Sequence, residues 1–67
     1  MIRLLINGQE TTMPDGAAVA SLVSALGRDG RGIAVAVNNG VVPRSLWGVT
    51  LLSDGDRIEI LTAAQGG

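Results

Sequence analysis

One stretch of this sequence has helical periodicity, and it constrains the fold more than any other feature. Between positions 17 and 26, apolar residues recur at i, i+3, i+4 and i+7, which places them on one helix face: Val19, Leu22, Val23 and Leu26. Alanine fills much of the remainder and favours the same conformation. We therefore predict a helix over about Ala18 to Leu26, with Gly27 ending it. A single amphipathic helix has to bury its apolar face against a sheet.

Strand periodicity surrounds this helix on both sides. Apolar residues recur at alternate positions in the first and last strands, and the pair Asn7-Gly8 is a strong hairpin signal because both residues tolerate positive φ. Pro43 ends a short strand because it cannot donate to a ladder. The predicted strands are residues 2–6, 9–13, 33–37, 41–42 and 57–62.

The order of these elements is hairpin, helix, hairpin and final strand. A strand that lies parallel to the first one needs a crossover connection, and the helix supplies it. The order is typical of the α+β class, in the β-grasp (ubiquitin-like) arrangement: a mixed sheet of four to five strands packed on one helix, with the first and last strands parallel at its centre. We expect one β-grasp domain over residues 1–62 and a flexible C-terminal tail over residues 63–67.

The predicted core consists of aliphatic side chains, because Trp47 is the only aromatic residue. We expect Trp47 to act as a hydrophobic lid on that core. The periodicities predict that these residues are buried: Ile2, Leu4, Ile6, Val19, Leu22, Val23, Leu26, Val35, Val37, Ile58 and Ile60.

The side-chain inventory excludes most kinds of catalysis by this chain. The sequence contains no histidine, cysteine, lysine or tyrosine, which are the usual general bases and nucleophiles. Zinc sites and disulfides are excluded for the same reason. The motif Asp54-Gly55-Asp56 lacks the acid spacing of a calcium loop, so we interpret it as a turn. If the protein takes part in a reaction, the reacting group is its terminal carboxylate.

Charge and hydropathy exclude two further classes of partner. Five arginines and six acidic residues are spread along the chain, with a net charge of −1 and no basic stripe, so we expect no nucleic-acid binding. No apolar run approaches the length of a membrane span, and we expect a cytoplasmic protein without a membrane partner.

The sequence ends in Gly66-Gly67, and the segments before this pair resemble the ThiS-type sulfur carriers of thiamine biosynthesis. The resemblance covers essentially the whole chain. Its matching segments are Val35-Ala36-Val37-Asn38, Val41-Val42-Pro43-Arg44-Ser45 with Trp47, Asp54-Gly55-Asp56-Arg57-Ile58-Glu59-Ile60, and Ala64-Gln65-Gly66-Gly67. The Asp-Gly-Asp turn and the terminal Gly-Gly are shared with molybdopterin sulfur carriers, whereas the Val-Pro-Arg-x-x-Trp segment points to thiamine. Ala18 departs from the family, which commonly has a capping threonine there.

The resemblance implies a protein co-substrate instead of an enzyme. An E1-like adenylyltransferase would use ATP and magnesium to adenylate the Gly67 carboxylate, and sulfur from a cysteine desulfurase route would convert it into a thiocarboxylate. Thiazole synthase would then take the sulfur. Gly67 is thus the implied covalent attachment point. The resemblance also implies that Ala64, Gln65 and Gly66 form the tail segment that enters a partner's active site, and that this chain itself binds no cofactor.

We also predict an interface for these partners on the sheet face away from the helix. Leu5 and Leu61 lie on adjacent predicted strands, with Ala34 and Ala36 as small neighbours, and clusters of exposed apolar residues mark interaction sites. Arg44 is a further candidate contact. Two alternatives stay open from the sequence: a molybdopterin-type sulfur carrier, and a non-catalytic β-grasp interaction module or protein modifier.

Overall fold

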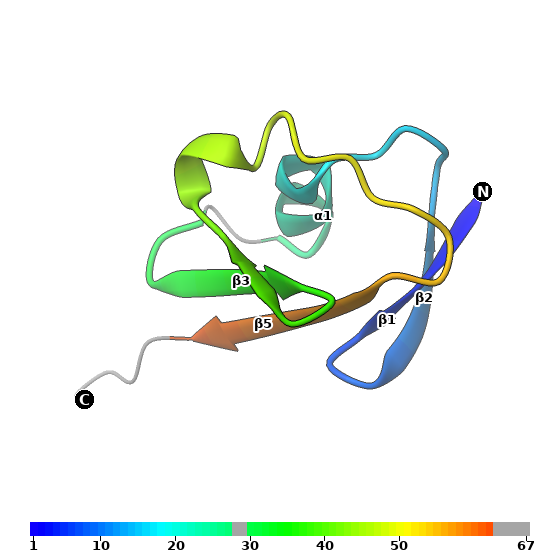
Figure 1. Ribbon diagram of the computed structural model, residues 1–67, viewed down its shortest axis with the longest axis horizontal. Helices are drawn as coiled ribbons and strands as arrows, with labels where there is room; N and C mark the ends of the chain where they lie inside the picture. The colour runs from blue at the N-terminus through cyan, green and yellow to red at the C-terminus, as the bar shows by residue number, and fades with distance from the viewer. Residues whose placement is uncertain (28–29, 63–67) are drawn as a thin grey trace.

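The structure is a computed structural model that describes residues 1–27 and 30–62, so the tail predicted for residues 63–67 lies outside the described residues. Within the described residues the elements follow the predicted order (Figure 1). They are β1 (Ile2–Ile6), β2 (Gln9–Met13), α1 (Val19–Ala25), β3 (Ile33–Val37), β4 (Gly40–Val42), the 3-10 helix η1 (Arg44–Leu46) and β5 (Arg57–Thr62).

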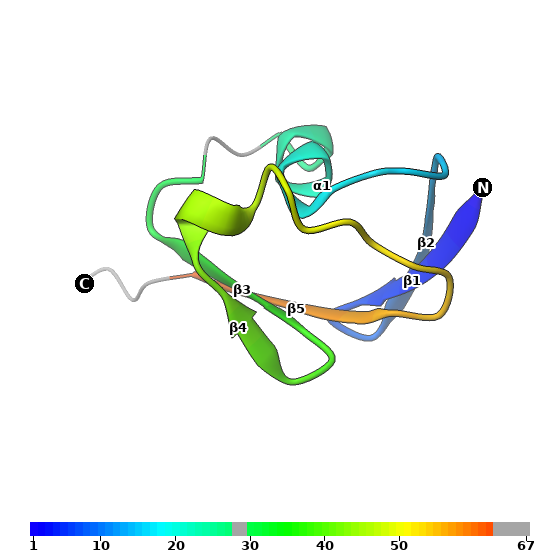
Figure 2. The same cartoon turned by 45° about the horizontal axis from the view of Figure 1, so that its top comes forward.

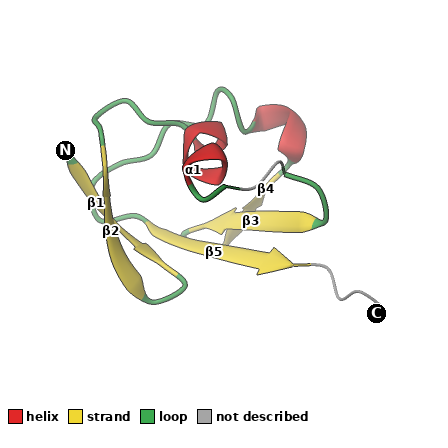
Figure 3. Ribbon diagram, turned by 180° about the vertical axis from the view of Figure 1, so that it is seen from behind, coloured by secondary structure: helices red, strands yellow, loops and turns green. Residues whose placement is uncertain are grey.

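The strands form one mixed sheet with the order β2-β1-β5-β3-β4. The first and last strands, β1 and β5, are parallel neighbours, whereas every other pair is antiparallel. Helix α1 covers one face of this sheet, and η1 lies on the same side (Figures 1 and 2). The opposite face carries no element among the described residues, as the view from behind also shows (Figure 3). This is the predicted β-grasp arrangement, which the structure confirms.

The hairpin of β1 and β2 forms because its turn residues accept an unusual backbone conformation. Asn7 and Gly8 have φ values of 49° and 85°. Positive φ at both central residues is what a two-residue turn needs to match the right-handed twist of its strands. This turn fixes the register from Ile6↔Gln9 to Ile2↔Met13, so alternate β1 residues face α1.

The start of α1 is held by a neighbouring loop and by Ser21, whose Oγ accepts a hydrogen bond from Ala18 N at 3.3 Å, and not by an N-cap side chain. Ala18 occupies the N-cap position and has no side-chain oxygen to accept a backbone hydrogen bond. The first free N–H groups of the helix instead donate to loop carbonyls, Val19 N to Thr50 O at 3.0 Å and Ala20 N to Trp47 O at 3.0 Å. The weak N-cap in the sequence is therefore compensated by a tertiary contact.

The core lies between α1 and the inner face of the sheet, and nearly all of its predicted residues are confirmed. Its most completely buried side chains are Leu4, Val19, Leu22, Val35 and Ile58. Val37 and Ile60 are half-buried and pack against the same cluster. The pattern did not predict four further core residues, namely Met13, Ala17, Ala18 and Leu52.

Trp47 closes the core at the side of η1, as predicted. It is 6% exposed, and its indole Nε1 donates to the Val42 carbonyl at 2.9 Å. Gly30 lies against the ring, and a Cβ placed on Gly30 would be 2.9 Å from a Trp47 ring carbon. A side chain at position 30 would therefore require the Trp47 ring to shift.

The predicted burial of Leu26 is wrong, because its side chain is 44% exposed. The helix ends at Ala25, and Leu26 is its C-cap residue. The chain then turns away through Gly27 at φ 77°. Leu26 borders an open hollow and not the closed core, since it follows the last helical residue.

Candidate functional site

Strand β5 is the element that leads to the terminal residues, and it occupies the middle of the sheet. It pairs with β1 on one side and with β3 on the other. Its carboxyl end points out of the sheet at one extremity of the molecule, far from the N-terminus (Figure 1). The predicted site residues Ala64, Gln65, Gly66 and Gly67 follow that end and lie outside the described residues.

The turn that begins β5 is built by its two aspartates, as the sequence predicts. Asp56 accepts a hydrogen bond from Ser53 N at 2.8 Å, and Asp54 accepts one from Arg3 N at 2.7 Å. Gly55 between them has a φ of 89° and donates to the Arg3 carbonyl at 2.7 Å. These contacts tie the start of β5 to β1. In the described part of the chain, no group of three acidic, histidine or cysteine residues could hold a metal ion.

The outer sheet face carries an exposed apolar strip that runs across β5, β3 and β4. Leu61 lies opposite Ala34, and Ala36 lies opposite Val41, so the four residues form neighbouring pairs on one face. Leu61 is 63% exposed and Val41 is 74% exposed. We call these four residues the outer apolar strip. A shallow hollow of about 330 Å³ borders the strip at Ala34 and Leu61.

Leu5 shares this face but is separated from the strip. In the register it lies opposite Arg57, four residues before Leu61 on β5. At about 3.3 Å per residue the two positions are roughly 13 Å apart along the strand. Arg57 beside Leu5 and Glu59 between the two leucines both face outward, and Glu59 lies opposite Ala36 of the strip. The structure therefore does not join Leu5 and Leu61 into one apolar cluster.

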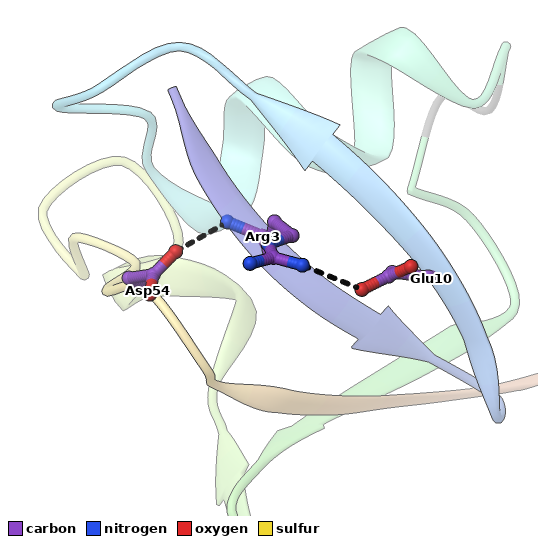
Figure 4. Close-up of polar contacts among 3 residues, drawn as sticks. All are labelled: Arg3, Glu10 and Asp54. Carbon is purple, nitrogen blue, oxygen red and sulfur yellow. Dashed lines mark hydrogen bonds and ion pairs between the residues drawn. The ribbon is translucent and has the colours of Figure 1, made fainter.

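The surroundings of Leu5 are charged and polar. Its neighbour on β1, Arg3, extends its guanidinium toward Glu10 on β2, with Nη1 3.5 Å from Oε2, while the Arg3 backbone reaches Asp54 (Figure 4). All three residues are exposed. Leu5 thus lies in the mixed half of the outer face, and Leu61 lies in the apolar half.

Arg44 does not belong to the outer face. It begins η1, which lies on the α1 side of the sheet (Figure 2). Its guanidinium carbon is 5.9 Å from the centre of the Trp47 ring, within the range of a cation–π contact. The structure therefore separates Arg44 from Leu5, Leu61 and Ala36, the other predicted interface residues.

The described body of the protein has no buried polar or charged side chain. Over residues 1–27 and 30–62, no helix is long and apolar enough to cross a membrane. What the described residues offer is a central strand that precedes the terminal residues, beside an exposed apolar strip.

Comparison with known proteins identifies the family. The ThiS family model matches residues 3–67. The sulfur carrier protein ThiS of Escherichia coli strain K12 is 32% identical over 66 residues, which are 98% of this chain and the whole of that protein. A thiazole synthase of Paramagnetospirillum magneticum is 36% identical over 66 residues, and the chain spans only 20% of its length.

A solved structure agrees with this assignment. The crystal structure of the thiamine biosynthesis protein ThiS from Geobacter metallireducens superposes with a TM-score of 0.85 at 30% identity, covering 98% of this chain and all of that one. The solution structure of a thiamine biosynthesis protein from the same organism gives a TM-score of 0.80 and covers 98% and 88%. The chain belongs to the ThiS family.

Proposed function

We propose that this chain is a sulfur carrier of thiamine biosynthesis, which holds sulfur as a thiocarboxylate on Gly67 and donates it to thiazole synthase. The observation that carries the proposal is the extent of the family match, which runs through residue 67 and so includes the terminal Gly66-Gly67. The Escherichia coli sulfur carrier aligns over its full length, which supports the same role.

The chemistry of the terminus fits this role. A carboxylate is a poor electrophile until one of its oxygens becomes part of a good leaving group. Attack of the Gly67 carboxylate on the α-phosphorus of ATP forms an acyl-adenylate and releases pyrophosphate. Sulfur supplied through a cysteine desulfurase route then displaces AMP. The carrier needs no catalytic side chain for these steps, because the E1-like adenylyltransferase supplies ATP, magnesium and the active site.

The small residues before Gly67 suit a narrow channel in a partner. A glycine has no Cβ, so Gly66 and Gly67 leave the carbonyl unhindered, and Ala64 adds only a methyl group. Gln65 is the one long side chain among these residues. From Thr62, five extended residues span at most about 18 Å. We propose that this length delivers the carboxylate to an active site while the β-grasp domain stays outside.

The outer apolar strip is the surface that we propose docks the adenylyltransferase and thiazole synthase. It adjoins the end of β5, so a partner that contacts Leu61 is next to the point where the terminal residues begin. Exposed apolar groups of this kind mark protein interfaces. The thiazole synthase relative contains a region similar to this whole chain, which supports thiazole synthase as a partner. Leu5 would contribute at the margin of this surface, and Arg44 would contact a partner only if the interface extended around β4.

Intact-mass measurement tests the proposal. The purified chain is incubated with the cognate adenylyltransferase, ATP, magnesium and a cysteine desulfurase sulfur source. Replacing one oxygen by sulfur adds about 16 Da, and fragmentation must place the added mass on Gly67. Addition of thiazole synthase and its other substrates should then return the original mass. A chain that keeps its original mass in the first step, with an authentic ThiS carrier converted in parallel, contradicts the proposal.

A further inference from the structure

The two sides of β5 are paired to different lengths. On the β3 side the ladder runs along nearly the whole strand, from Val37↔Ile58 to Ile33↔Thr62. On the β1 side the strand register contains only Leu5↔Arg57 and Ile6↔Ile58. The β1 ladder stops there because β1 ends at Ile6 and the chain turns at Asn7.

The side chain of Asn7 continues the interrupted ladder. Its backbone N–H donates to the Ile58 carbonyl at 2.9 Å. Its side-chain Oδ1 accepts from Ile60 N at 2.9 Å, and its Nδ2 donates to the Ile60 carbonyl at 3.2 Å. A side-chain amide carries the same donor and acceptor as a peptide group. Asn7 therefore replaces the next residue that β1 would have supplied.

We propose that Asn7 is a positioning residue for the carrier reaction: its amide fixes the last part of β5 and thereby sets where the terminal segment begins. This inference rests on the proposed function. A hollow of about 390 Å³, lined in part by Asn7, Ile60 and Thr62, borders this edge of β5.

The protein contains a natural control for this role in its second hairpin. Asn38 also has positive φ, at 50°, and its Oδ1 also accepts a backbone hydrogen bond from β5, from Arg57 N at 2.9 Å. Its Nδ2 donates to Asp56 at 3.0 Å. Asn38 thus holds the beginning of β5, whereas Asn7 holds the part next to the terminus.

The experiment compares Asn7→Gly with Asn38→Gly. Glycine removes the side-chain amide and still accepts positive φ, so both turns can keep their backbone conformation. In Asn7→Gly the backbone amide hydrogen of Ile60 should exchange with solvent faster than in the wild-type chain. In Asn38→Gly the backbone amide hydrogen of Arg57 should exchange faster. Urea denaturation is expected to show a similar loss of stability for the two variants, since each loses side-chain hydrogen bonds to β5 and its turn.

Kinetics then separate positioning from stability. In ATP–pyrophosphate exchange with the adenylyltransferase, Asn7→Gly should raise the KM for the carrier about fivefold, since binding must restore the order that about one net hydrogen bond otherwise gives the end of β5. The kcat should stay within about twofold, because the bound terminus is held by the enzyme. Asn38→Gly should change the KM by less than about twofold.

Three results would overturn the inference. One is an equal KM for the two variants while the wild-type chain supports normal ATP–pyrophosphate exchange. That result would leave the proposed function standing. Another is a rate of hydrogen exchange at the Ile60 amide that is the same in Asn7→Gly as in the wild-type chain. A wild-type chain that supports no exchange refutes the proposed function itself and with it the kinetic part of this inference. If Asn7→Gly does not fold, Asn7→Asp keeps the acceptor and loses the donor to Ile60, and it should still raise the KM more than Asn38→Asp.

Discussion

The inner and outer faces of the sheet are built by the same strands, yet they are covered very differently. On β5, Ile58 faces α1 and has no exposed surface, whereas Leu61 faces outward and is 63% exposed. On β3, Val35 is fully buried while Ala34 is exposed. Because successive side chains of a strand point to opposite faces of the sheet, alternate residues of one strand face the core and the solvent. The inner positions stabilise the fold, and the outer ones remain available for recognition.

The largest expected effect tests this division within one strand. Ile58→Ala removes a fully buried side chain and should cost about 2–5 kcal/mol, enough to unfold much of a domain of this size. Leu61→Ala, on the outer face, should cost less than about 0.5 kcal/mol. Urea denaturation followed by circular dichroism measures both values. Equal losses would show that the two faces are not distinct in energy.

The lid on the inner side gives the second effect. Gly30→Ala would place a Cβ 2.9 Å from the Trp47 ring and 3.3 Å from the Arg44 guanidinium, at a φ of 89°. We expect a loss of about 2 kcal/mol and a change in tryptophan fluorescence, from overpacking and backbone strain. Gly32→Ala is the control, because it has positive φ but no neighbour within 4 Å of the added Cβ. Identical losses in the two variants would mean that Gly30 is required only for its backbone conformation.

The outer face is tested by a matched pair of leucines. Leu61 on β5 is 63% exposed, and Leu51, in the loop that pairs with Ala18 beside α1, is 64% exposed. Leu61→Glu should weaken docking to the adenylyltransferase about tenfold, or about 1.4 kcal/mol, without loss of fold. Leu51→Glu should leave docking unchanged. Isothermal titration gives both affinities, and weaker binding by Leu51→Glu alone would move the interface to the helix side.

The smallest effect concerns the charged half of the outer face. Arg3 and Glu10 form an ion pair at 3.5 Å, but their side chains are 69% and 64% exposed. Glu10→Gln should therefore change stability by less than about 0.5 kcal/mol. Asp54→Ala removes a 2.7 Å acceptor for a backbone N–H and should cost about 1 kcal/mol. Thermal melting of the two variants ranks the contacts, and a larger loss in Glu10→Gln would reverse the ranking.

Most of the fold follows from local sequence patterns because these patterns are strong here. The bounds of β2 and β5 agree with the prediction, and the helix differs by one residue at each end. The predicted burial of Leu26 is wrong because periodicity identifies a helix face but does not say where the sheet beneath it stops. Periodicity does not mark Ala17 and Leu52 as buried because they lie in loops, and in the fold a hydrogen bond from Leu52 N to the Ala17 carbonyl joins them.

The candidate site was predictable in part, for a different reason. The outward direction of Leu5 and Leu61 follows from alternation, and the structure confirms that both are exposed. Their separation depends on the register of two distant strands, which alternation does not contain. The side-chain bonds of Asn7 were likewise not predicted. The sequence marks Asn7 as a turn residue, and only its position beside Ile60 reveals a second role.

The measurement that bears most directly on this account is ATP–pyrophosphate exchange with chains altered only at the terminus. Deleting Gly67 moves the carboxylate back by about 3.5 Å, and Gly66→Val adds bulk and restricts φ. Both variants should unfold at the same urea concentration as the wild-type chain, while neither supports exchange with the adenylyltransferase. Exchange at the wild-type rate by either variant would show that the reactive group is not the Gly67 carboxylate, and the carrier function would be wrong.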